Sequence, residues 1–208
     1  MSIDVWLAFV AASVVLLLIP GPTILTVISY SVAHGNRANV PLVAAVALGD
    51  STALALSLLG LGALLSVSSF WFVVVKSIGG LYLIWLGIKL LRAGVQATDV
   101  TKAPSIGSRW QLFANTWLVT ALNPKGIIFF VAFLPQFVDV SAPTAPQLWL
   151  LSLTFVTLAT INATLYAVFA GSARRLLASP RAQRRFNLAG GSLLSLAGVW
   201  ALSARQTA

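Results

Sequence analysis

Two prolines and a glycine interrupt the first apolar run of the sequence, where Pro20-Gly21-Pro22 stands inside the stretch from Val5 to Val32. Proline lacks a backbone N–H and clashes with the preceding helical turn, which costs about 3 kcal/mol or more in a helix interior. At membrane depth such a break leaves carbonyl groups without water, so it is tolerated only where protein or an aqueous cavity surrounds it. The motif and the adjacent Thr23 are therefore predicted to form half of a substrate-binding element.

The composition places the chain among integral membrane proteins. Of its 208 residues, 59% are hydrophobic and 8% are charged, and its mean hydropathy of +0.95 lies far outside the range of soluble domains. The net charge of +9 is interpreted as topology signals facing anionic lipids, so membrane lipids and not nucleic acid are the expected partners. With no cysteine and one histidine, His34, no metal site or cofactor is predicted.

Six apolar runs are long enough to cross about 30 Å of hydrocarbon as helices. They cover residues 4–33, 40–65, 70–92, 111–138, 147–171 and 187–203, and the first is expected to remain as a helix and not to be a cleaved signal. Lys and Arg gather in the first, third and fifth connections, whereas the second and fourth carry none. The positive-inside rule then predicts that both termini lie outside, with Arg205 as the exception.

Helices three and six share a glycine pattern. Gly79-Gly80 and Gly87 are matched by Gly190-Gly191 and Gly198, each 111 residues later. Two halves of three helices each must insert with opposite orientation, which is the inverted-repeat plan of secondary transporters. One transmembrane domain is therefore predicted, with repeat one at residues 1–93, a linker at 94–110 and repeat two at 111–208. The alternative is that small residues at seven-residue spacing are general packing faces of membrane helices.

Asn123-Pro124-Lys125 interrupts the first helix of the second half, as Pro20-Gly21-Pro22 interrupts that of the first. Gly or Asn at the cap and Pro at the first turn favour the start of a new half-helix. With opposite insertion, the two half-helix N-termini face each other near the midplane and offer unpaired N–H groups and partial positive charge to a carboxylate. The alternative is that both motifs only kink packed helices.

Asp50 and Lys125 are charges placed deep inside predicted spans. A cation at the bilayer centre costs about 2.5–3.5 kcal/mol on insertion scales, so each of the two is expected to be the partner of the other. Asp50 is predicted to exchange a proton while Lys125 or the half-helix ends hold an anionic group; the alternative is a purely structural ion pair. In helix five, Thr160, Asn162, Thr164 and Tyr166 either line a polar path or bond across packed helices.

Five motifs follow one another in a characteristic order and spacing: Pro20-Gly21-Pro22, Gly49-Asp50, Gly79-Gly80, Asn123-Pro124-Lys125 and Pro135-Gln136-Phe137. Over essentially the whole chain this pattern resembles the LysE/RhtB family of amino-acid exporters. The resemblance implies a six-helix exporter, not an enzyme, that moves amino acids such as threonine, homoserine, lysine or leucine out across the bacterial cytoplasmic membrane by proton exchange. Thr23 stands where the family often has Asn or Asp, which leaves the substrate open.

Other classes fit the residues less well. An intramembrane protease needs paired aspartates, or a serine with a histidine, inside the membrane, but Asp50 is the only acid well inside a span and His34 is expected at the surface. A divalent-cation exporter needs several oxygen ligands, which a single acid and a lysine do not supply. A channel, an exporter of another small solute, a non-transporting membrane subunit and a homo-oligomer all stay open.

Overall fold

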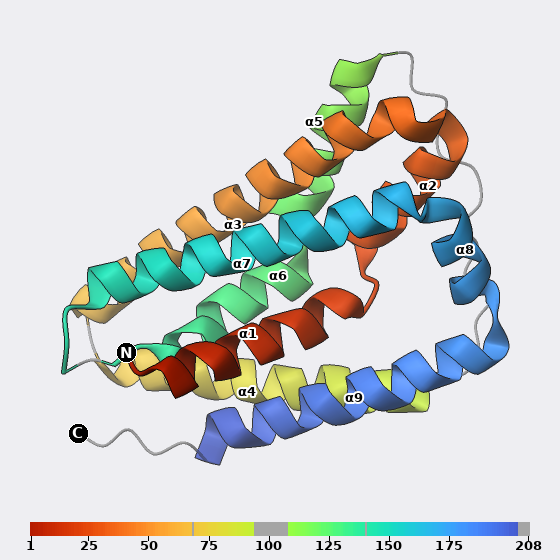
Figure 1. Ribbon diagram of the computed structural model, residues 1–208. Helices are drawn as coiled ribbons and strands as arrows, with labels where there is room; N and C mark the ends of the chain where they lie inside the picture. The colour runs from red at the N-terminus through yellow and green to blue at the C-terminus, as the bar shows by residue number, and fades with distance from the viewer. Residues whose placement is uncertain (68, 94–107, 140, 204–208) are drawn as a thin grey trace.

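The computed structural model describes residues 1–67, 69–93, 108–139 and 141–203, and all regular structure in these ranges is helical, as predicted (Figure 1). The chain before residue 94 forms α1 (Ile3–Leu18), α2 (Pro22–His34), the 3-10 turn η1 (Gly35–Ala38), α3 (Asn39–Val67) and α4 (Ser69–Arg92). The chain after residue 107 forms α5 (Arg109–Ala121), α6 (Pro124–Ile128), the π-helical η2 (Phe129–Phe133), the 3-10 turn η3 (Leu134–Phe137), α7 (Thr144–Val168), α8 (Ala170–Ala178) and α9 (Pro180–Ser203).

The long helices lie side by side in one bundle, with the N-terminus and the C-terminal end of α9 at the same end (Figure 1). By length and composition, three stretches of the described chain can cross a membrane, Pro22–Gly60, Arg109–Phe137 and Thr144–Val168, and Ile3–Leu18 is a shorter apolar helix. Large apolar side chains are exposed along the bundle, as Trp149 at 77% and Leu153 at 67% illustrate. An apolar outer surface of this extent is that of a membrane protein.

The prediction that the fifth connection, residues 172–186, is a loop is wrong. This segment is helical, because α8 occupies Ala170–Ala178 and α9 already begins at Pro180. Ala, Arg and Leu are strong helix formers, and proline is favoured at the first helical position. The hydropathy pattern missed α8 and the first residues of α9, because these basic segments are not apolar enough to cross a membrane. The predicted linker lies almost entirely in residues 94–107, outside the described residues, as does Arg205.

Helices α4 and α9 run antiparallel, and their backbones touch at glycines (Figure 1). A Cβ on Gly87 would lie 2.6 Å from the carbonyl oxygen of Gly191, and a Cβ on Gly191 would lie 2.7 Å from that of Gly87. Gly198 and Gly80 approach each other in the same way, at 2.6 and 3.3 Å. Small residues permit such close approach of membrane helices, so these glycines hold α4 against α9.

Replacing Gly87 with alanine is therefore expected to destabilise the protein by about 1–3 kcal/mol, the usual cost of overpacking. The added methyl group would collide with the Gly191 carbonyl and the Ser195 hydroxyl. Gly60→Ala is the matched control, because a Cβ there meets nothing within 4 Å and alanine favours the helix. The melting temperature in detergent should fall for Gly87→Ala only; equal values for the two variants would contradict the close packing.

Candidate functional site

The first candidate element lies between α1 and α2, where Ile19 to Gly21 leave helical geometry. Ile19 has φ −74° and ψ 110°, and Gly21 has φ −112° and ψ −172°, so both are in ordinary extended conformations. Gly21 is thus not required by backbone strain. As the N-cap of α2 it makes no side-chain hydrogen bond, so the first N–H groups of α2 receive no acceptor from their cap.

The second candidate element lies between α5 and α6, where Asn123 is the N-cap of α6. Its Oδ1 accepts a hydrogen bond of 3.1 Å from the backbone N–H of Lys125. Its Nδ2 donates to Oγ1 of Thr23 over 3.0 Å. Thr23 and Asn123 are both 7% exposed, and this buried contact brings the start of α2 directly against the start of α6.

Lys125 reaches across from α6 to the end of α1. Its Nζ donates to the carbonyl oxygens of Leu16 at 2.9 Å and Ile19 at 2.7 Å. A helix that ends leaves its last carbonyls unpaired, and a cation there also interacts favourably with the helix dipole. The ammonium group thus satisfies the last carbonyls of α1, and a direct pairing of Lys125 with Asp50 stays a prediction.

Two side chains of α7 complete the capping of α1. Asn162 Nδ2 donates to the carbonyl oxygen of Leu17 at 3.2 Å, and the Tyr166 hydroxyl donates to that of Leu18 at 3.1 Å. Thr160 and Thr164 donate to carbonyls of α7 itself, whereas Asn162 and Tyr166 bond across packed helices. The signal in the sequence was their spacing of four residues, which places both on one face of a helix.

Asp50 is 8% exposed and lies on α3 beside a close contact between α3 and α5. At the preceding residue, Gly49, a Cβ would lie 2.6 Å from the Cβ of Thr120. The absence of a side chain at Gly49 therefore lets α3 pack closely on α5. This packing fixes the position of the Asp50 carboxyl group within the bundle.

A small polar cavity of about 30 Å³ joins these elements. Its polar wall is formed by Thr23, Asp50, Asn123, Lys125 and Asn162. The remaining wall is mainly apolar: Leu16, Leu17, Ile24, Val46, Phe155 and Ala159. A water needs about 10–15 Å³ of such volume, so the cavity has room for one or two waters and is too small for an amino acid.

The structure brings most of the predicted site residues together and separates a few. Gly21, Thr23, Asp50, Asn123 and Lys125 all line the same cavity. The three prolines of the two motifs, Pro20, Pro22 and Pro124, shape the chain next to it without lining it. The described residues contain no group of three or more His, Cys, Asp or Glu side chains that could hold a metal.

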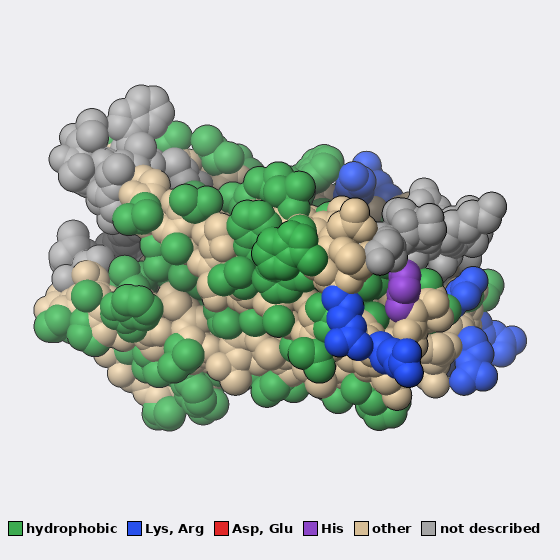
Figure 2. Space-filling model, turned by 90° about the horizontal axis from the view of Figure 1, so that it is seen from above, with side chains coloured by type: hydrophobic (Ala, Val, Ile, Leu, Met, Phe, Trp, Pro, Cys, Tyr) green, Lys and Arg blue, Asp and Glu red, His purple; other side chains and the backbone are tan. Residues whose placement is uncertain are grey.

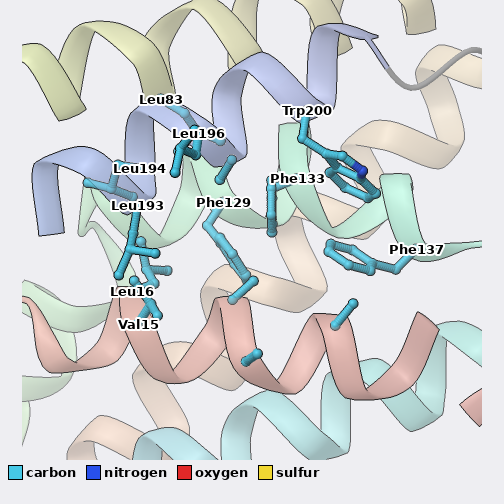
Figure 3. A pocket seen from close by; sticks show the side chains of 14 residues that line it. Val15, Leu16, Leu83, Phe129, Phe133, Phe137, Leu193, Leu194, Leu196 and Trp200 are labelled. Atoms are coloured by element: carbon cyan, nitrogen blue, oxygen red, sulfur yellow. The ribbon is translucent and has the colours of Figure 1, made fainter. Parts of the chain in front are cut away.

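A larger pocket of about 330 Å³ lies between α1, α4, η2 to η3 and α9, and Leu16 belongs to both walls (Figure 3). It is lined by Ala, Val, Leu and Phe side chains and one tryptophan. Phe133 and Phe137 contact Trp200 with ring centroids 6.2 and 5.4 Å apart. Because this wall offers no charged partner, the polar cavity is the candidate site for a charged solute.

The comparisons with known proteins agree on one family. The model of the LysE type translocator family matches residues 14–205. The homoserine/homoserine lactone efflux protein of Salmonella typhimurium is 34% identical over 206 residues, covering 99% of this chain and 100% of that protein. An uncharacterized membrane protein of Vibrio cholerae is 33% identical over 205 residues, covering 99% and 100%. The leucine efflux protein of Klebsiella pneumoniae is 32% identical over 139 residues, covering 67% and 66%.

No solved structure matches the chain significantly. The resemblance drawn from the five motifs is confirmed, because the family model matches residues 14–205, which include all five motifs and nearly the whole chain. The protein is a membrane translocator and not an enzyme, and the chain belongs to the LysE type translocator family.

Proposed function

We propose that the protein is a secondary active transporter that exports amino acids or close derivatives across the bacterial cytoplasmic membrane, by proton antiport with alternating access. The observation that carries the proposal is the small polar cavity between α1, α2, α3, α6 and α7, with a buried acid and a cation in its polar wall. The names of two relatives, which refer to homoserine, homoserine lactone and leucine, support amino acids as the substrate class.

The substrate carboxylate binds between the start of α2 and Lys125. Pro22 has no N–H and Gly21 supplies no cap, so Thr23 and Ile24 hold the unpaired N–H groups of this turn. Both residues line the cavity. Lys125 has three N–H donors and gives two of them to α1, which leaves one for the carboxylate.

Asp50 carries the proton in this proposal. Its carboxylate binds either a proton or the ammonium group of the substrate, and both cannot occupy it together. Ammonium binding therefore releases the proton, and this mutual exclusion is what exchange of an amino acid for a proton requires. Apart from Lys125, which the proposal assigns to the substrate carboxylate, the polar side chains of the cavity are neutral amides and hydroxyls, so Asp50 is the proposed proton carrier.

The glycine contacts between α4 and α9 support an inverted repeat. Moving each residue to its counterpart 111 positions away turns the pair Gly80 and Gly198 into the pair Gly191 and Gly87, and both pairs are in contact. A contact that reproduces itself under exchange of the halves is the mark of a two-fold axis. The proposed axis passes between α4 and α9.

The proposed topology has six crossings, with both termini outside. Residues 1–93 form one repeat and residues 111–208 the other, within one transmembrane domain. The shared location of the N-terminus and the end of α9 supports an even number of crossings (Figure 1). The cavity of about 30 Å³ must widen to admit substrate, and rocking of one repeat against the other would open it to each side in turn.

Counterflow in vesicles tests the proposed function. Vesicles that contain the purified protein are loaded with one unlabelled amino acid, and labelled homoserine, threonine, leucine or lysine is added outside. We expect transient accumulation of at least one label in the loaded vesicles and none in vesicles without protein. Folded protein that exchanges none of these solutes would favour a transporter of another solute or a non-transporting subunit.

A further inference from the structure

Helix α8 crosses the end of the bundle opposite the termini and joins α7 to α9 (Figure 1). Five exposed arginines lie along α8 and the start of α9: Arg174, Arg175, Arg181, Arg184 and Arg185. The acidic residues that the structure describes are Asp4, Asp50 and Asp139, which are buried in the bundle or lie toward its other end. Within the described chain, the positive charge at this end is therefore not neutralised, and it gathers beside a largely apolar surface (Figure 2).

A groove of about 610 Å³ opens where α8 turns into α9. Arg181 and Arg185 lie on its wall, four residues apart on one face of α9. Leu176 and Phe186 line the same groove, together with the hydroxyl-bearing Ser179. Leu176 is 51% exposed, so the groove presents two guanidinium groups directly beside open apolar surface.

Exposed apolar side chains also lie at the start of α8, the helix whose other end borders the groove. Val168 and Phe169, at the junction of α7 and α8, are 55% and 59% exposed. Apolar side chains that are this open on a membrane protein face lipid tails. A groove that holds a pair of arginines beside the exposed Leu176 and beside Phe186 matches a phospholipid, which has acyl chains attached to a phosphate.

We propose that this groove binds an anionic phospholipid of the leaflet that faces this end of the bundle. Arg181 and Arg185 hold the phosphate oxygens, because a guanidinium group matches phosphate geometry with paired hydrogen bonds. Leu176 and Phe186 contact the start of an acyl chain. A second negative charge in the headgroup adds to the attraction, since basic groups next to a membrane favour anionic lipids.

Lipid retention in nanodiscs tests the proposal, with the full-length protein and two double variants of equal charge. Arg181→Gln with Arg185→Gln alters the groove, whereas Arg174→Gln with Arg175→Gln removes two arginines of α8 that do not line it. Phosphatidylglycerol is titrated into phosphatidylcholine, and bound lipids are counted by native mass spectrometry. The groove variant should bind phosphatidylglycerol about tenfold more weakly than wild type, and the α8 variant should bind almost normally.

Thermal unfolding in detergent separates a lipid from a free anion. We expect phosphatidylglycerol to raise the melting temperature of wild type and of the α8 variant but not of the groove variant. Inorganic phosphate should leave all three unchanged. An equal loss of binding in both double variants would show a diffuse charge effect, and an equal shift with inorganic phosphate would show a simple anion site; either result overturns the proposal.

Discussion

Replacing Lys125 with methionine is expected to lower amino-acid counterflow by about tenfold or more, a larger loss than for any neutral residue of the cavity. Methionine keeps the apolar stem but removes the ammonium group that donates to the carbonyls of Leu16 and Ile19. It also removes the cation proposed to attract the substrate carboxylate. A buried carbonyl left without a donor costs about 1–3 kcal/mol, so a lower melting temperature should accompany the loss of transport.

Tyr166→Phe is the matched control for Lys125→Met. It removes the donor to the Leu18 carbonyl from the same end of α1 without removing a charge, and Tyr166 does not line the cavity. If Lys125 both caps α1 and binds substrate, the two variants should lose similar stability, but only Lys125→Met should raise the substrate concentration needed for half-maximal counterflow. An unchanged half-maximal concentration in Lys125→Met, measured on folded protein, would restrict Lys125 to a structural role.

Replacing Asp50 with asparagine is expected to abolish proton-driven accumulation while exchange persists at saturating substrate. Asparagine keeps the shape of the side chain but cannot take up and release a proton. In vesicles with an imposed pH gradient, wild type should accumulate amino acid on the acidic side, because protons leaving that side are exchanged for substrate entering it. Asp50→Asn should reach equal concentrations on both sides, and its exchange should no longer depend on pH.

Ser51→Ala provides the control for Asp50→Asn. Ser51 is the next residue of α3, its hydroxyl donates to the carbonyl of Ala47 within the same helix, and it does not line the polar cavity. This variant should accumulate substrate as wild type does. If Asp50→Asn also drives accumulation at the wild-type rate and with the same pH dependence, Asp50 has a structural role and another group must carry the proton.

Local features of the sequence determined the class of the protein and the places where its helices end. Long apolar runs predict membrane helices wherever they occur. A proline disfavours the helical conformation of the residue before it, independently of the tertiary surroundings. In the structure, α2 begins at Pro22 and α6 begins at Pro124. The order of five short motifs was also enough to indicate the family that the comparison confirmed.

Only the tertiary structure decided which groups meet in the site. Lys125 contacts a carbonyl 109 positions away, and Asn162 contacts one 145 positions away. Charge alone favoured a direct pair of Lys125 with Asp50, but the sequence does not show that the last carbonyls of α1 end up beside the ammonium group. Burying those carbonyls unpaired is costly, so the arrangement of α1 against α6 and α7 determined the partners. The sequence likewise could not give the volume of the cavity, because that depends on how closely side chains from five helices pack.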